Sequence, residues 1–133
     1  MNIDIAAVLR QSLLLSGVSE KLLEDFDGHS TISLDFEDDI SICIDVIDED
    51  VWIWNCVADE SANLVSQRGA LLLEKLMQGC AFARGGQLML STQDGEVVLK
   101  GMIHPEFLQI PERFIEALNE FYTSVKDMRK SLQ

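Results

Sequence analysis

The sequence lacks any long hydrophobic segment. Hydrophobic residues make up 47% of the chain, yet the longest unbroken apolar run covers only a few residues. A helix that crosses a bilayer needs about 20 consecutive apolar residues, so we predict no membrane span. The first residues, MNIDIAAVLRQ, also lack the basic start and the cleavage site of a signal peptide. We therefore expect a soluble protein of the cytoplasm.

Basic residues are scarce. The chain has 10 lysines and arginines against 23 aspartates and glutamates, which gives a formal net charge of −13. Such a surface repels phosphate backbones and anionic lipid headgroups, so we expect neither a nucleic acid nor a membrane partner. Two interpretations of the acidity stay open: it keeps a protein with exposed apolar patches in solution, or it attracts a basic partner.

Cysteine and proline are also few. The three cysteines, at positions 43, 56 and 80, are odd in number and widely spaced, which fits neither a disulfide framework nor a zinc site. Cys43 and Cys56 lie in predicted strands, where we expect them to pack as small hydrophobic residues. There is no proline-rich linker, low-complexity segment or internal repeat. Residues 1–133 are therefore predicted to form a single domain.

The first half of the chain changes its hydrophobic period from helical to extended. Residues 3–16 have the apolar spacing of an amphipathic helix, and a second short helix is predicted at residues 19–28. Strands are then predicted at residues 32–36 and 40–46, joined by an acidic turn. The next strand, residues 51–57, is apolar on both faces, so we expect it to be covered on both sides.

The second half repeats this change. A helix is predicted through Met77, with Asp59 or Ser61 as its cap and Gly79 just after its end. Strands around residues 88–90 and 96–103 follow, and the glycine-containing turn between them is typical of a hairpin. A last helix begins near Pro111. Its apolar residues step by four and three, which fits a core helix; they are Phe114, Leu118, Phe121, Val125, Met128 and Leu132.

The predicted element order is therefore α-β-β-β-α-β-β-α. It indicates an α+β domain with an antiparallel twisted sheet covered by helices. The chain offers more apolar surface than one small core can cover, at Leu64, Leu72, Leu76 and strand 51–57. We therefore predict a homodimer whose interface centres on helix 61–77. The alternative is that this helix packs only on its own sheet.

Residues that carry out chemistry are almost absent. Nothing in the sequence around His29 and His104 suggests a catalytic partner, so we interpret both as ordinary loop residues. The acidic stretches at residues 37–39 and 48–50 lack the ligand spacing of an EF-hand, and Gly85-Gly86 lacks the lysine and serine or threonine of a P-loop. We therefore predict no catalytic residue, no metal site and no cofactor, and we do not expect an enzyme.

Four stretches, taken together, resemble a known family. They are DGHSTISLDF (27–36), DVWIW (50–54), GCAFARGGQL (79–88) and IHPEFL (103–108). In order and spacing they resemble the InvB-type chaperones, which are class I (class IB) chaperones of bacterial type III secretion systems and serve several effectors. The resemblance covers most of the chain.

The resemblance implies a function without nucleotide hydrolysis. A homodimer of small α+β subunits would bind the amino-terminal segments of several secreted effectors in the bacterial cytoplasm and keep them extended and secretion-competent. The secretion ATPase or the export apparatus are further candidate partners.

We predict that the client segment adds to an exposed strand edge and places apolar side chains in grooves between helix 3–16 and the sheet. The densest apolar positions near these edges are the candidate contacts: Leu9, Leu13, Phe36, Ile42, Ile44, Trp52 and Trp54. The alternative for each of them is burial in the core.

Two other functions remain open. One is a small ligand-binding or hydrolase domain that uses His29 or His104 with nearby carboxylates. The other is a structural adaptor within the secretion apparatus, whose partner would stay behind rather than be exported.

Overall fold

Helices and strands follow one another in the predicted order. The computed structural model describes residues 5–17, 31–59 and 63–132, so the predicted helix at 19–28, His29 and Ser61 lie outside the described residues. The elements are α1 (Ile5–Leu15), β1 (Ile32–Asp35), β2 (Ser41–Ile47), β3 (Asp50–Asp59), α2 (Leu64–Met77), β4 (Met89–Gln93), β5 (Glu96–Met102) and α3 (Pro111–Ser131). The α+β class and the antiparallel sheet are confirmed.

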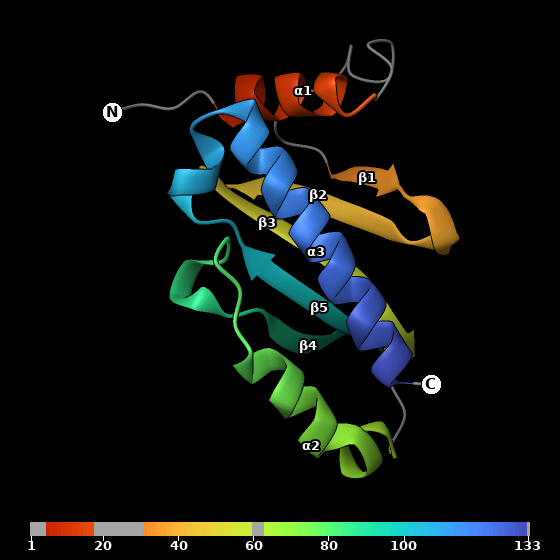
Figure 1. The fold of residues 1–133 in the computed structure, drawn as a ribbon. Coiled ribbons are helices and arrows are strands. Elements are labelled where there is room, and N and C mark those ends of the chain that lie inside the picture. Colours follow the sequence, from red (N-terminus) through yellow and green to blue (C-terminus); the bar gives the residue numbers. More distant parts are fainter. Residues whose placement is uncertain (1–4, 18–30, 60–62, 133) are drawn as a thin grey trace.

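The five strands form one sheet in the order β1-β2-β3-β5-β4, with every neighbouring pair antiparallel (Figure 1). Two of the connections are two-residue hairpin turns, Asp48-Glu49 and Asp94-Gly95, in which both residues have positive φ. Such turns match the right-handed twist of the strands they join. The edges of the sheet are therefore β1, which has only four residues, and β4.

The core lies between the inner face of this sheet and α3, which runs diagonally across it (Figure 1). Side chains of α3 at the predicted spacing are fully buried, among them Phe114, Phe121 and Val125. Phe121 meets Phe82 edge to face, with ring centroids 6.3 Å apart. The helix α1 packs beside the start of α3 and adds Leu9 and Leu13 to the buried set. The prediction that the last helix is a core helix is thus confirmed.

The helix α2 begins later than expected. Asp59 is the last residue of β3, and the N-cap is Asn63, so the prediction that Asp59 caps this helix is wrong. The predicted end is confirmed, because Gly79 has φ +76° and its N–H bonds to the carbonyl of Leu76. An added Cβ at Gly79 would lie 2.9 Å from the carbonyl oxygen of Gly86, so this exit requires glycine.

All three described helices lie on the same side of the sheet. Lys75 of α2 pairs with Asp127 of α3 at 3.0 Å, and the space between these helices is floored by Leu99 of the inner face. On the opposite, outer face, Trp52, Trp54 and Cys56 are only half-buried. The expectation that strand 51–57 is covered on both sides is therefore not met among the described residues.

Truncating the buried side chains of α3 tests this packing. Leu118→Ala or Phe121→Ala should lower the free energy of unfolding by about 2–5 kcal/mol, because each leaves a cavity in the core. Chemical denaturation measures the loss, and Glu120→Ala on the exposed side of the same helix is the control. A variant that instead dissociated into a stable, fully folded monomer would move a dimer interface onto α3.

Candidate functional site

Four of the seven predicted contact residues are buried in the core. Leu9 and Leu13 of α1 and Ile42 and Ile44 of β2 are at most 1% exposed. Leu9, Ile42 and Ile44 belong to the core between α1, α3 and the inner face of the sheet, whereas Leu13 is buried outside that cluster. The structure thus brings three of the four together, but beneath the surface of a single chain, and contact of all four with a client stays a prediction.

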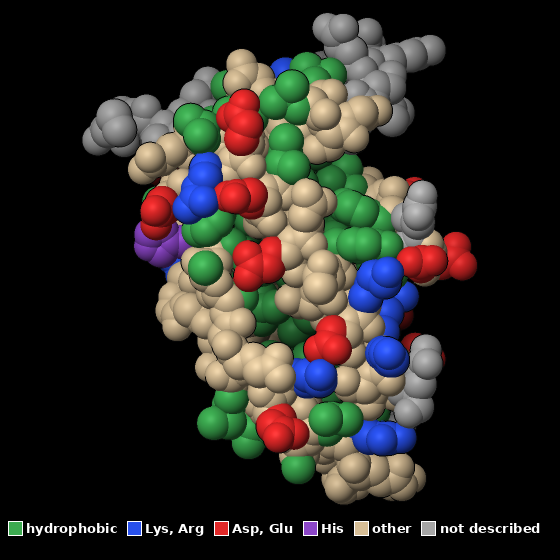
Figure 2. All heavy atoms as spheres, viewed as in Figure 1, with side chains coloured by type: hydrophobic (Ala, Val, Ile, Leu, Met, Phe, Trp, Pro, Cys, Tyr) green, Lys and Arg blue, Asp and Glu red, His purple; other side chains and the backbone are tan. Residues whose placement is uncertain are grey.

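Phe36 lies at the surface boundary beside the β1 edge. It is half-buried and stacks on Tyr122 of α3, with ring centroids 4.8 Å apart. The hydroxyl of Tyr122 donates to a carboxylate oxygen of Asp38 at 3.2 Å, and the ammonium of Lys126 lies 3.4 Å from that oxygen. These contacts tie α3 to the β1–β2 connection. Figure 2 shows hydrophobic side chains gathered between α3 and this hairpin, with acidic side chains at its tip.

Trp52 and Trp54 occupy the outer face. The indole N–H of Trp54 donates to Asp45 at 2.8 Å, and the ammonium of Lys100 lies 5.7 Å above the Trp52 ring. Trp54 belongs to a row that crosses all five strands; its members are Ser33, Cys43, Trp54, Lys100 and Met89. The outer face therefore has an aromatic centre with polar surroundings, a composition common at protein interfaces.

The cysteines are poorly suited to nucleophilic chemistry. Burial, followed by the nearby Glu96 carboxylate, raises the pKa of the Cys56 thiol to about 11. Burial also raises the pKa of Cys43 and of Cys80. Each thiol stays protonated at neutral pH, and the thiolate is the reactive form. The packing role predicted for Cys43 and Cys56 is consistent with this chemistry.

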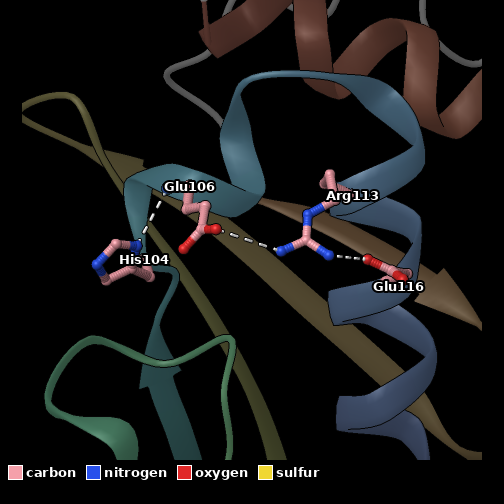
Figure 3. Close-up of polar contacts among 4 residues, drawn as sticks. All are labelled: His104, Glu106, Arg113 and Glu116. Carbon is pink, nitrogen blue, oxygen red and sulfur yellow. Dashed lines mark hydrogen bonds and ion pairs between the residues drawn. The ribbon is translucent and has the colours of Figure 1, made fainter.

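His104 caps a short turn rather than pairing with a carboxylate. Its Nδ1 accepts a hydrogen bond from the backbone N–H of Glu106 at 3.1 Å, at the start of the 3-10 turn Pro105–Leu108. The Glu106 carboxylate instead lies 3.7 Å from Arg113, which binds Glu116 at 2.7 Å (Figure 3). The side chain thus has a structural task, and no nucleophile is placed beside it among these contacts.

The cavity between α2 and α3 is too small for a typical small ligand. The cavity between α2 and α3 measures about 60 Å³ and is bordered by the Lys75–Asp127 pair. Typical ligand pockets measure about 300–1,000 Å³. Within residues 5–17, 31–59 and 63–132, no three histidine, cysteine or acidic side chains gather as a metal site. In the same part of the chain, no helix is long and apolar enough to cross a bilayer.

The surface of α2 differs from the predicted one. Leu72 is buried, and Leu64 and Leu76 pack partly against the core. The exposed apolar residues of α2 are instead Val65, Leu73 and Met77, which are 57–69% exposed. Val65 and Leu73 lie eight residues apart and Leu73 and Met77 four, so the three side chains lie along one stripe of the helix. Sequence reasoning missed this stripe because a helix with leucines on several sides has more than one candidate face.

Removing the His104 cap separates a structural role from a catalytic one. His104→Ala should lower the free energy of unfolding by about 1 kcal/mol, whereas His104→Asn, which keeps a side-chain acceptor, should lie close to wild type. Denaturant titration measures both. A variant of unchanged stability that lost a hydrolytic activity of the purified chain would support the hydrolase alternative.

Comparisons with known proteins agree on one family. The family model for the Invasion protein B family matches residues 17–94. Over 131 residues the chain is 45% identical to the surface presentation of antigens protein SpaK of Salmonella typhimurium, covering 98% of this chain and 97% of the relative. The SpaK protein of Salmonella typhi matches equally well.

Two solved structures share the fold. The structure of the ExsC-ExsE complex aligns with a TM-score of 0.61 at 13% identity, over 94% of this chain and 87% of that one. YbjN from E. coli aligns with a TM-score of 0.62 at 16% identity, over 96% and 92%. At these identities the likeness concerns the fold alone.

Proposed function

The chain belongs to the invasion protein B family, as the resemblance implied, and from this membership we propose that it is a type III secretion chaperone. It binds the amino-terminal segments of several effectors in the bacterial cytoplasm and keeps them extended and secretion-competent. The binding needs no ATP. The chain acts as a binding protein and not as an enzyme, and the secretion ATPase or the export apparatus receives the loaded complex.

The observation that carries this proposal is that β1 is an edge strand of the described sheet, with half-buried aromatic side chains near it and on the outer face. A strand edge offers unpaired backbone groups, and an extended peptide can satisfy them by adding a strand. Phe36 beside the edge and Trp52 and Trp54 on the outer face then supply apolar contacts. Leu9, Leu13, Ile42 and Ile44 support this surface from beneath. Support also comes from the ExsC-ExsE complex, one chain of which shares the fold.

The homodimer is proposed to form through the exposed stripe of α2. Val65, Leu73 and Met77 would be costly to leave in water, and Gly69 lies in the same stripe, where its missing side chain lets a second helix approach closely. In a two-fold interface the same stripe meets its copy. Leu64, Leu72 and Leu76, the residues expected from the sequence, hold α2 onto its own subunit.

The rival functions make different demands. A hydrolase needs a base with a partner, and the ring nitrogen Nδ1 of His104 is already engaged by a backbone N–H. A structural adaptor would keep its partner inside the bacterium. Recovering the tagged chain from the native bacterium with its bound proteins, and then following those proteins into the secreted fraction, distinguishes an adaptor from a chaperone.

Client contacts are tested by shortening the aromatic side chains. Phe36→Ser or Trp52→Ser should weaken binding of a recovered client segment about tenfold or more, because buried aromatic anchors dominate such interfaces. Ile110→Ser is the control, since Ile110 is 50% exposed on a different part of the chain. Calorimetry with and without ATP measures the affinity, and circular dichroism checks the fold. Binding that requires ATP would contradict the mechanism.

The dimer interface is tested by charge. Leu73→Asp with Met77→Asp should convert a species of about twice 14.9 kDa into a folded monomer, because burying unpaired carboxylates is costly. Leu15→Asp, which alters a comparably exposed leucine of α1, is the control. Light scattering at micromolar concentration measures the mass. A wild-type mass of one chain would reject the dimer itself.

A further inference from the structure

The negative charge of the chain is concentrated in one segment. Between residues 22 and 67 there are 13 acidic residues and no lysine or arginine, whereas the remaining 10 acidic residues are balanced by 10 basic ones. This segment therefore carries the entire formal net charge of −13. In the structure, its described residues 31–59 form β1, β2 and β3 and the connections between them, and residues 63–67 begin α2.

The same region holds a sheet edge whose hydrogen-bonding positions can be assigned. The N–H of Phe36 donates to the carbonyl of Ile40 at 2.7 Å, so these two residues form a hydrogen-bonded pair. Because such pairs alternate along an antiparallel ladder, Leu34 and Ile32 direct their backbone groups toward β2. Thr31, Ser33 and Asp35 direct theirs outward. An added strand would bond to these three residues.

The two sides of this edge differ in chemistry. On the inner side lie the half-buried Ile32, Leu34 and Phe36, which pack against the core. On the outer side lie Asp35 and, next to Thr31, Asp45. Asp35 accepts from the Ser41 hydroxyl and Asp45 from the Trp54 indole. Within the described part of the chain, neither carboxylate pairs with a lysine or an arginine.

The spacing of the carboxylates defines the pattern of a complementary strand. Thr31, beside Asp45, and Asp35 are four residues apart on β1, which is about 13 Å along a strand. Residues four apart in an added strand project to the same side. Of the three residues between them, the first and the third project to the opposite, apolar inner side.

On these grounds we propose that the β1 edge selects a client segment with two basic residues four positions apart. Of the three residues between them, the first and the third are apolar. The inference rests on the proposed chaperone function and adds the chemistry of the partner. It chooses β1 over the β4 edge, since the acidic segment forms β1 and not β4. The excess of negative charge attracts the cationic segment, and the strand ladder holds it.

The test uses the full-length protein and three dye-labelled peptides of equal length. One has lysines four apart with alternate valines between them, and in the others the lysines are replaced by glutamates or by glutamines. At low salt, fluorescence anisotropy should show that the lysine peptide binds at least about tenfold tighter than the glutamate peptide. At about 0.5 M salt the advantage should shrink, because exposed charges are screened. Equal binding of all three peptides would overturn the charge selection.

Matched variants locate the effect. Asp35→Asn with Asp45→Asn keeps a hydrogen-bond acceptor at each position and should weaken the lysine peptide about fivefold. Glu112→Gln with Glu120→Gln removes the same two charges from α3 and should change the affinity less than twofold. Similar losses in both pairs would show attraction by the net charge rather than by this edge.

Methylation of the peptide backbone tests the edge itself. In the lysine peptide, the backbone N–H groups of successive residues point to opposite sides, so only every second amide faces β1. Methylating the amides that face β1 should abolish binding, and methylating the others should be tolerated. Equal tolerance of both sets would overturn strand addition. Dissociation of the dimer by the peptide would instead make this edge a subunit interface. A natural client that binds normally while the lysine peptide does not would reject only the client pattern and leave the chaperone function standing.

Discussion

The packing of α3 against the inner face of the sheet is the constraint on which the rest of the structure depends. Its buried face, with Phe114, Phe121 and Val125 fully enclosed, covers the inner sides of the strands, and burial of this kind is the dominant favourable contribution to folding. Because α1 and α2 also pack on that side, the described helices leave the outer face uncovered. Among the described residues, the uncovered outer face is therefore a consequence of how the core is built.

The element order could be predicted because each element has one clear hydrophobic period. Apolar residues recur every second position in the strands and every third or fourth position in α3. This spacing shows which side chains share one face of each element. The turn residues Asp94-Gly95 and the exit glycine Gly79 are recognisable because only a few residue types tolerate positive φ. These are local properties, and local properties can be read from a sequence.

The site was harder to predict from the sequence, because residues of the core and residues of a binding groove have the same apolar spacing. Leu9 and Ile42 were chosen for their dense apolar spacing, yet dense spacing is also what a fully buried face requires. Which side of a strand is covered depends on where the helices pack, and this is a tertiary property. Trp52 is a case in point: its strand is apolar on both faces, and only the fold shows that the helices lie opposite it.

The placement of the acidic residues bears on the two interpretations of the charge. Asp38, Asp39, Asp48 and Glu49 all have positive φ, a conformation that aspartate tolerates better than most residues with a side chain. Turn geometry therefore accounts for the aspartates at the turns. Solubility depends on net charge wherever it lies, so it does not explain why the excess charge gathers in residues 22–67. Attraction of a basic partner, as proposed above, would favour charge beside the β1 edge, where Asp35 lies. Asp38 has a second role, because its carboxylate lies 3.4 Å from the ammonium of Lys126 and ties the β1–β2 connection to α3.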